Sequence, residues 1–321
     1  MLKIAVTGGT GFVGRHLVRT LVRGGHRVAI IARGWDTRDP GVRQLPQTEF
    51  YPIGLDSEDA LSEAFAGCAG VVHCAGINRE IGGQTYQRVH IDGTRNVVKA
   101  AGRADARRLV MLSFLRARPN CGSPYHESKW EAEQVVRASS LDYTIIKAGV
   151  IYGRGDHMLD HISHALHTFP IFPLVGMTDT RLRPTAVQDV VTILQAAVVE
   201  GRLTRATVAV RGPEELTLRA LVGRIASVVG KRPLVFGMPV FLHDAVSRMC
   251  ETLMTVPLES RAQVRILAEG VTQPLPDCPD PPEDLTPHTR FTDEAIRDGL
   301  PAPEAFGLCD CRCVHRWVRE S

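Results

Sequence analysis

The most constraining feature of this chain is a glycine-rich turn that follows its first apolar run. Residues 3–7 read KIAVT, residues 8–14 read GGTGFVG, and an amphipathic stretch with helical period begins at Phe12. Glycines in this spacing permit a tight turn, a close backbone approach to a pyrophosphate and close packing of a helix on a strand. The free N–H groups at the start of the helix would face the phosphates, and a glycine-rich turn without a ligand is the alternative. The residues that we predict to contact a dinucleotide here are Gly8, Thr10, Gly11, Phe12, Val13 and Gly14.

Strand-like and helical patterns alternate through the first half of the chain. Apolar runs predict strands over Lys3–Thr7, Arg27–Ala32, Gly70–Ala75, Arg108–Ser113 and Tyr143–Lys147. Helical periods between them predict helices over Phe12–Arg23, Ser57–Ala66, Gln84–Gly102 and Pro124–Ser139. Alternation of this kind requires a parallel sheet with right-handed crossovers. We therefore expect an α/β fold, a doubly wound parallel sheet of the Rossmann type.

The second half of the chain is less regular and predicts a smaller, mixed region. It contains proline-broken loops and several short helical patterns, one of which begins after Thr217, a residue suited to capping a helix. We expect residues 1–155 to form the dinucleotide-binding domain, with residues 184–205 packing back onto it. Residues 156–321 would form the smaller substrate-binding region.

The residue that follows the second predicted strand selects the cofactor. An acidic side chain there would bind the ribose 2′-hydroxyl of NAD, whereas this chain has Arg33, whose guanidinium suits a 2′-phosphate. NADP is therefore favoured over NAD, and a solvated surface arginine is the alternative. Asp56 is expected either to hydrogen-bond the adenine amine or to cap the helix that follows it.

Tyr125 and Lys129 are four residues apart in a predicted helix and therefore share one face. A phenol has a reference pKa of about 10, and a nearby ammonium group would lower that pKa so that Tyr125 exchanges a proton with a substrate oxygen. Ser113 ends the preceding predicted strand and would hydrogen-bond the same oxygen. Because Tyr-x-x-x-Lys also arises by chance, an amphipathic helix without a catalytic role is the alternative. Its place directly after the predicted strand Arg108–Ser113 favours catalysis.

Five segments, taken in order, resemble the extended and atypical short-chain dehydrogenase/reductases. They are residues 7–14 (TGGTGFVG), 73–76 (HCAG), 89–94 (VHIDGT), 125–129 (YHESK) and 151–156 (IYGRGD). Within that superfamily the chain is similar to NAD-dependent epimerase/dehydratase proteins and to the nucleotide-binding accessory subunit of respiratory complex I. The resemblance implies a Rossmann domain, a nicotinamide cofactor and a catalytic Ser113, Tyr125 and Lys129. It also places Ala75, Gly76, Tyr125 and Lys129 against the cofactor.

Three positions depart from the pattern of this superfamily. His90 replaces an asparagine that is common in the helix, and Lys147-Ala148-Gly149 replaces Arg-Pro-Gly at the end of the predicted strand Tyr143–Lys147. Phe114 follows Ser113 where sugar-nucleotide epimerases have a second serine. We therefore consider two functions: an NAD(P)-dependent oxidoreductase or epimerase, and a structural or redox-sensing protein that binds NADPH without turnover.

Charge and hydropathy narrow the range of partners. The chain has 38 Lys and Arg against 35 Asp and Glu, a net charge of +3, which is no signature of binding to nucleic acid or to an anionic membrane. No apolar stretch reaches the roughly 20 residues of a membrane-spanning helix, and the N-terminus shows no secretory signal pattern. We expect a cytoplasmic protein with a small-molecule substrate. The resemblance is compatible with a homodimer, because many relatives dimerise through two helices, one of which bears Tyr-x-x-x-Lys.

Two clusters of metal-binding residue types lie outside these motifs. The first, in a predicted helix, is His157, His161, His164 and His167. Histidines at this spacing can chelate a metal, but lining of the substrate cleft or exposure to solvent is favoured. The second is Cys309, Cys311 and Cys313 with His315. Its spacing matches zinc sites poorly, and a redox-sensitive thiol cluster or an incidental surface tail are the other interpretations, so no metal site is predicted.

Overall fold

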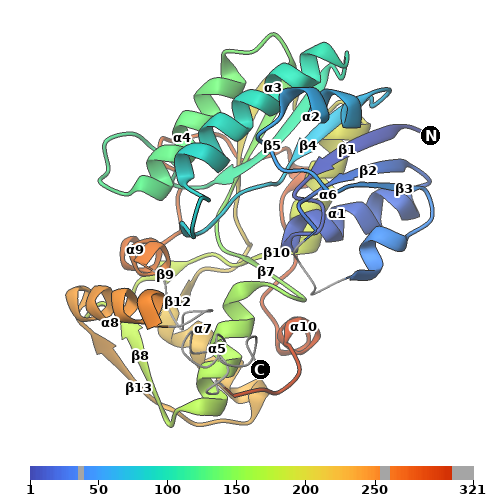
Figure 1. Ribbon diagram of the computed structural model, residues 1–321. Coiled ribbons are helices and arrows are strands. Elements are labelled where there is room, and N and C mark those ends of the chain that lie inside the picture. The colour runs from blue at the N-terminus through green and yellow to red at the C-terminus, as the bar shows by residue number, and fades with distance from the viewer. Residues whose placement is uncertain (35–39, 254–260, 306–321) are drawn as a thin grey trace, which may run out of the picture. The chain divides into compact units, whose positions relative to one another are not determined.

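The computed structural model describes residues 1–34, 40–253 and 261–305, which form parts of two compact units (Figure 1). The first unit comprises residues 1–149, 187–211 and 273–288. The second comprises residues 150–186, 212–272 and 289–321. The chain thus passes repeatedly between the two units. The cysteine cluster near the C-terminus, with His315, lies outside the described residues.

The first unit is built on a seven-stranded parallel sheet with the strand order β11-β6-β5-β4-β1-β2-β3. Its strands are β1 Lys3–Thr7, β2 Arg27–Ile31, β3 Thr48–Tyr51, β4 Gly70–His73, β5 Arg108–Phe114, β6 Asp142–Ala148 and β11 Ala206–Val210. Because β1 lies between β2 and β4, the order of the strands reverses beside it. This is the doubly wound α/β arrangement that the sequence predicts, and ligands bind at such a reversal in open sheets.

Helices cover both faces of this sheet (Figure 1). They are α1 Phe12–Arg23, α2 Glu58–Phe65, α3 Gly93–Arg103, α4 Pro124–Arg137 and α6 Val187–Val199, with short 3₁₀ turns at Pro40–Gln44 and Glu283–Leu285. On one face α1 packs against α6, and on the other α3 packs against both α2 and α4. Crossovers that place helices on both faces leave the central strands buried on both sides.

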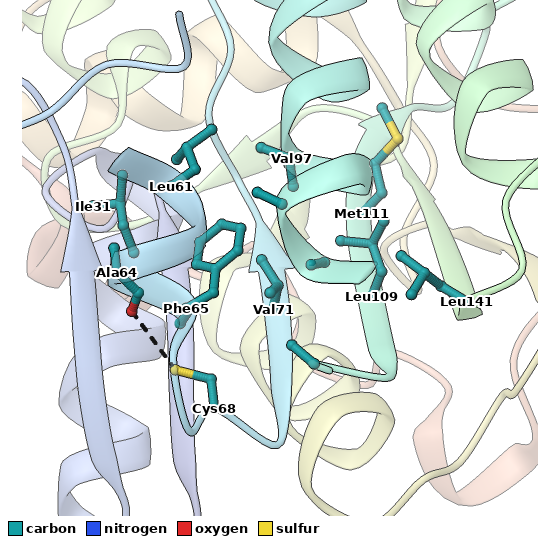
Figure 2. Packing of buried hydrophobic residues seen from close by; sticks show 14 of the residues in the cluster. Ile31, Leu61, Ala64, Phe65, Cys68, Val71, Val97, Leu109, Met111 and Leu141 are labelled. Carbon is teal, nitrogen blue, oxygen red and sulfur yellow. Dashed lines mark hydrogen bonds between the residues drawn. The ribbon is translucent and has the colours of Figure 1, made fainter. Parts of the chain in front are cut away.

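One part of the core lies between the sheet and the helices α2 and α3. Figure 2 shows Phe65 of α2 among side chains that include Val71 of β4, Val97 of α3 and Leu109 of β5. All four side chains are fully buried. The continuous aliphatic runs of the strands therefore reflect burial on both faces, as expected of a parallel sheet.

The predicted strands and helices of the first unit mostly end within two residues of the observed bounds. The predicted helix Gln84–Gly102 is wrong at its start, because Ile81 and Gln84 exchange backbone hydrogen bonds of 3.1 and 3.0 Å across a tight turn. The chain then forms a π-helix over Gln87–Asp92 before α3 begins. Strand β3 lacks a clear apolar run because it is an edge strand whose residues are only half buried.

The second unit combines helices with three two-stranded sheets. Its strands are β7 Ile151–Tyr152, β8 Ile171–Val175, β9 Arg181–Leu182, β10 Thr185–Ala186, β12 Leu216–Thr217 and β13 Leu234–Met238. Its helices are α5 His157–Thr168, α7 Leu218–Val229, α8 Val240–Leu253, α9 Arg261–Glu269 and α10 Asp293–Gly299. Thr217 caps α7, as the sequence predicts, by accepting a hydrogen bond of 3.1 Å from the amide of Ala220. Asp156 caps α5 in the same way, accepting from Leu159 at 2.7 Å.

Candidate functional site

The glycine-rich loop after β1 is held so closely that side chains are excluded from it. Gly8 has φ +68°, and a Cβ built on it would lie 2.8 Å from the backbone of Ala75 at the end of β4. A Cβ built on Gly14 would lie 2.2 Å from the carbonyl oxygen of Gly8. Both distances are well inside van der Waals contact. The loop therefore requires glycine at both positions, one for its backbone conformation and the other for its packing.

The N-terminus of α1 is open toward this loop. Its N-cap residue is Gly11, no side chain caps it, and its first turn contains no acidic residue. By contrast, Ser57 caps α2 by accepting from the amide of Ala60 at 3.2 Å. The positive end of the α1 dipole and its free N–H groups are therefore available to an anion, and the absence of side chains from the loop leaves room for one. These residues fit a dinucleotide pyrophosphate.

Arg33 and Asp56 lie side by side at the edge of the same unit. A Cβ built on Gly54 would lie 3.2 Å from Asp56 Oδ2 and 3.9 Å from Arg33 Cγ. The carboxylate of Asp56 accepts a hydrogen bond of 2.7 Å from Arg88 Nε, in an exposed ion pair. The expected role of Asp56 as a helix cap is wrong, because the N-cap of α2 is Ser57. Arg33 is exposed and forms no ion pair with any residue that the structure describes.

Tyr125 and Lys129 lie on one buried face of α4. The Tyr125 ring packs against the rings of Phe114 and His90, with centroid distances of 5.5 and 5.8 Å. A Cβ built on Gly76 would lie 3.1 Å from Lys129 Nζ, so the ammonium group lies against the backbone that follows β4. The structure thus brings Lys129 beside Gly76, and Gly8 beside Ala75, along the carboxyl ends of neighbouring strands.

Burial controls the protonation of this pair. It raises the pKa of the Tyr125 phenol above its ordinary value, and it lowers the pKa of Lys129 to about 8. Tyr125 is therefore a neutral phenol at neutral pH, and Lys129 is mostly an ammonium ion. From the sequence, we expect the Lys129 ammonium to lower the pKa of Tyr125. In the structure, desolvation instead raises the pKa of Tyr125, and it lowers the pKa of Lys129.

The Ser113 hydroxyl forms a hydrogen bond with a buried carboxylate of α4. Ser113 Oγ donates to Glu133 Oε1 at 2.5 Å, and Glu133 also accepts from Arg137 at 2.9 Å. Lys147, one of the positions that depart from the family pattern, lies 3.5 Å from the same carboxylate and donates to the carbonyl of Ala117 at 2.9 Å. In the observed rotamer, Ser113 therefore belongs to a buried ionic network rather than to the Tyr125–Lys129 face.

His90, which replaces the common asparagine, connects α4 to the segment after β4. Its Nε2 accepts from the amide of Ile77 at 3.1 Å, so the ring proton lies on Nδ1 and is donated to Ser128 Oγ at 2.9 Å. Ser128 in turn donates to the carbonyl of Tyr125 at 3.0 Å. Burial and the nearby Lys129 lower the pKa of His90 well below its ordinary value. A neutral imidazole with one donor and one acceptor therefore connects α4 to the segment after β4.

A second buried chain of hydrogen bonds leads back to the glycine-rich loop. Thr94 donates to the carbonyl of His90 at 2.5 Å and so accepts from His73 Nε2 at 3.1 Å. His73 Nδ1 then accepts from the hydroxyl of Thr7, the last residue of β1, at 2.7 Å. Burial lowers the pKa of His73 to about 3, which keeps its ring neutral.

Sequence reasoning did not assign roles to His73, Thr94, Ser128 or Glu133. All four are polar side chains that are buried in the first unit. Their signal in the sequence is weak, because a polar residue at the end of a strand or within a helix is usually exposed. His73 and Thr94 do lie inside segments that carry the family resemblance, HCAG and VHIDGT.

The histidines of α5 make local contacts in the second unit. His164 Nδ1 lies 2.8 Å from the carbonyl of Asp160, and His167 Nδ1 lies 2.9 Å from that of Ser163. His157 and His161 pack edge to face, with ring centroids 5.9 Å apart. Within the ranges 1–34, 40–253 and 261–305, no three His, Cys, Asp or Glu side chains are placed to hold a metal ion.

Comparison with known families identifies the first half of the chain. Residues 8–162 match the family model described as NAD(P)H-binding. The matched residues make up just under half of the chain and are similar to NAD(P)H-binding domains. The match includes the glycine-rich loop and the Tyr125–Lys129 pair. Together with the relatives described below, it confirms the resemblance to the extended and atypical short-chain dehydrogenase/reductases.

Two named relatives show how far the similarity extends. Ceramide reductase of Caulobacter vibrioides is 33% identical over 186 residues, which cover 58% of this chain and 57% of that protein. The mitochondrial subunit 9 of the NADH dehydrogenase (ubiquinone) 1 alpha subcomplex of Mus musculus is 26% identical over 249 residues, 76% of this chain and 66% of that protein. The chain therefore spans little more than half of the first relative and about two thirds of the second.

Solved structures support the fold. The crystal structure of UDP-glucuronic acid 4-epimerase from Bacillus cereus, in complex with UDP-glucuronic acid and NAD, has a TM-score of 0.66 at 16% identity. It covers 92% of this chain and 97% of the epimerase. Identity this low shows a shared fold and nothing more. In the part of the chain that the structure describes, no helix is both long and apolar enough to span a membrane.

Replacing Gly14 with alanine tests the glycine-rich loop. Because the new Cβ would lie 2.2 Å from the Gly8 carbonyl, the loop must shift, and we expect Gly14→Ala to weaken NADPH binding at least about tenfold, or about 1.4 kcal/mol. Titration followed by NADPH fluorescence measures the change. Gly102→Ala is the matched control, since a Cβ there meets no atom within 4 Å and alanine favours the helix. Equal affinity in both variants would contradict the assigned loop geometry.

Variants of His90 test the connection to α4. His90→Leu leaves the amide of Ile77 and the hydroxyl of Ser128 without their partner, and an unsatisfied buried group costs about 1–3 kcal/mol of the free energy of unfolding. His90→Asn keeps one acceptor and one donor and should lose less. Denaturant unfolding of both variants measures the difference. A leucine variant as stable as the asparagine variant would show that these hydrogen bonds contribute little.

Proposed function

We propose that this protein is an oxidoreductase that uses NADPH to reduce a carbonyl group to an alcohol. The observation that carries this proposal is the buried pair Tyr125 and Lys129, which shares one unit with a glycine-rich loop that fits a dinucleotide pyrophosphate. A bound nicotinamide would supply the hydride. An epimerase would use the same residues for oxidation followed by reduction, with the cofactor retained between the two steps.

Tyr125 has the protonation state that carbonyl reduction requires. Its hydroxyl forms no hydrogen bond with any residue in the described part of the chain, so it is available to a substrate. As a neutral phenol it donates a proton to the oxygen that becomes an alkoxide, and the positive charge of Lys129 stabilises the phenolate left behind. Burial excludes water from the pair and strengthens this electrostatic effect, because the local dielectric constant is low.

Ser113 is proposed to orient the substrate oxygen. The next residue, Phe114, is the last of strand β5, and its ring lies 5.5 Å from the Tyr125 ring between centroids. To serve this role, the hydroxyl must exchange its bond with Glu133 for one with the substrate. Glu133 would keep two other partners, Arg137 and Lys147, so the carboxylate would not be left unpaired.

Arg33 supports the preference for NADPH over NADH. It is an exposed guanidinium at the end of β2, and it lies beside Asp56 at Gly54. A guanidinium can bind the 2′-phosphate through two hydrogen bonds, whereas it gains little from a 2′-hydroxyl. Asp56 is already paired with Arg88 through one carboxylate oxygen. We propose that this ion pair fixes the position of Asp56 and that its second oxygen contacts the adenine amine.

The name of one relative supports the direction of the reaction. The Caulobacter vibrioides protein is called a ceramide reductase, and it covers 58% of this chain at 33% identity. We accordingly propose a carbonyl substrate that is reduced, and we do not extend the substrate of that protein to this one. The cytoplasmic location and the homodimer expected from the sequence stay predictions.

A second function is favoured by two observations. One is the similarity to subunit 9 of the mitochondrial NADH dehydrogenase 1 alpha subcomplex, over 76% of this chain. The other is the hydrogen bond that directs the Ser113 hydroxyl to Glu133. In this alternative the protein binds NADPH as a structural or redox-sensing component. The two functions differ in one measurable property, the turnover of NADPH with carbonyl compounds.

Tyr125→Phe separates the two functions. In an enzyme, loss of the phenol should lower turnover by about 10²- to 10⁴-fold, as expected for a missing general acid, while NADPH affinity changes little. NADPH consumption with a panel of ketones and aldehydes measures this, and fluorescence titration gives the affinity. Ser113→Ala should also lower turnover if Ser113 orients the substrate. Tight NADPH binding with no turnover in the wild-type protein would favour the structural or sensor function.

The rate of reduction should depend on pH through Lys129. The Lys129 ammonium is present below its pKa of about 8 and is lost above it, so we expect kcat/KM for reduction to be flat below about pH 8 and to fall at higher pH. Lys129→Arg keeps the charge in this range, because a guanidinium has a pKa above about 12. The residual activity of that variant should therefore show no such fall. The same fall in both proteins would assign it to another group.

Arg33→Ala tests the cofactor preference. The variant should bind NADPH at least about tenfold more weakly, the loss expected when a charge-assisted hydrogen-bond pair is removed, and should bind NADH almost unchanged. Parallel titrations with the two cofactors measure the selectivity. Arg23→Ala is a matched control, because Arg23 is an exposed arginine at the far end of α1. Parallel weakening of both cofactors would contradict a contact with the 2′-phosphate.

A further inference from the structure

Residues 240–249 of helix α8, in the second unit, bury two polar side chains and expose several apolar ones. His243 and Ser247, four residues apart, are buried, with 2% and 0% exposure. Leu242, Val246 and Met249 follow the spacing of one helical face and are exposed, Met249 at 55%. A helix on a water-facing surface normally buries its apolar stripe and exposes its polar one. The apolar stripe of α8 is therefore suited to an apolar environment outside the unit.

Exposed apolar side chains also lie on the strand that precedes α8 in the chain. Leu234 and Phe236 of β13 alternate on one exposed face, and Leu234 pairs in register with the exposed Ile171 of β8. Strand β13 leads directly into α8, whose first turn exposes Phe241 at 70%. We call this surface the apolar face, and it consists of Leu234, Phe236, Phe241, Leu242, Val246 and Met249.

Positive charge borders the apolar face. Lys231 and Arg232 are exposed immediately before β13, and neither side chain has an ion-pair partner among the described residues. The acidic side chains described beside this face are already paired, Asp179 with Arg219 at 3.5 Å and Asp244 with Arg248 at 2.9 Å. Lys231 and Arg232 are therefore available to an anionic partner.

We propose that the apolar face docks on the surface of a lipid bilayer that carries anionic headgroups. Aromatic and aliphatic side chains on one face of a helix, bordered by lysine and arginine, match the pattern of helices that lie in the membrane interface. Phe241, Leu242, Val246 and Met249 enter the boundary between headgroups and acyl chains. Lys231 and Arg232 meet the headgroup phosphates.

A second copy of the chain fits the apolar face less well. Protein–protein interfaces are depleted in lysine relative to the rest of the surface, and a copy would have to supply two acidic partners for Lys231 and Arg232. A bilayer supplies both an apolar layer and anionic groups at the depth that each side chain requires. Docking of this kind needs no membrane-spanning helix, and it is independent of the proposed reduction.

Vesicle sedimentation with the full-length protein tests the proposal. Phosphatidylcholine vesicles that contain phosphatidylglycerol should retain the wild-type protein, and vesicles of phosphatidylcholine alone should retain less. The double variant Phe241→Ser/Leu242→Ser should bind the mixed vesicles about tenfold or more weakly, because two apolar side chains no longer leave water. Lys231→Ala/Arg232→Ala should also bind more weakly, about fivefold for each charge, and should lose most of the salt dependence.

The matched control is Ile81→Ser/Leu275→Ser, which removes two exposed apolar side chains of the first unit. It should bind vesicles like the wild type, and NADPH titration of all variants checks that the first unit remains folded. Equal vesicle binding by wild type and Phe241→Ser/Leu242→Ser would overturn the proposal. So would an absence of vesicle binding together with a dimer that Phe241→Ser/Leu242→Ser dissociates, which would assign the face to a second copy. Neither outcome bears on whether the protein reduces carbonyl groups.

Discussion

The close approach of the glycine-rich loop to its neighbours is the constraint on which the proposed site depends. Gly8 lies against Ala75 at the end of β4, and Gly14 lies against the Gly8 carbonyl. These contacts leave the start of α1 uncapped and free of side chains, so its dipole and N–H groups face the space above the sheet. They also bring the ends of β1 and β4 to the same place, where the strand order reverses.

Buried hydrogen bonds join this loop to helix α4, which carries Tyr125 and Lys129. Thr7, His73 and Thr94 form one chain, and His90 with Ser128 forms the next, ending at the Tyr125 carbonyl. Each hydroxyl and ring nitrogen in this path has a donor or acceptor partner. A fully satisfied buried network favours one geometry, because breaking any bond leaves a desolvated polar group. The position of Tyr125 is therefore coupled to the loop that would hold the cofactor.

The buried charges of α4 fall into two groups with different physical roles. Lys129 lies against the backbone of Gly76 and has its pKa lowered by burial, so its protonation can respond near neutral pH. Glu133 is surrounded by Arg137, Lys147 and the Ser113 hydroxyl, which compensate its buried charge. Helix α4 thus carries Lys129, whose charge can change near neutral pH, and Glu133, whose charge is balanced by buried partners.

The sequence by itself determined the doubly wound sheet and the Tyr125–Lys129 face, because apolar runs, helical periods and glycine spacing are local properties of the chain. It gave no bounds for the edge strand β3, whose half-buried residues lack an apolar pattern, and it did not reveal the π-helix at His90. Tertiary structure alone decided that Ser113 bonds to Glu133, that Asp56 pairs with Arg88, and that desolvation raises the pKa of Tyr125. Hydrogen-bond partners and burial depend on segments that are distant in the sequence, so no local pattern encodes them.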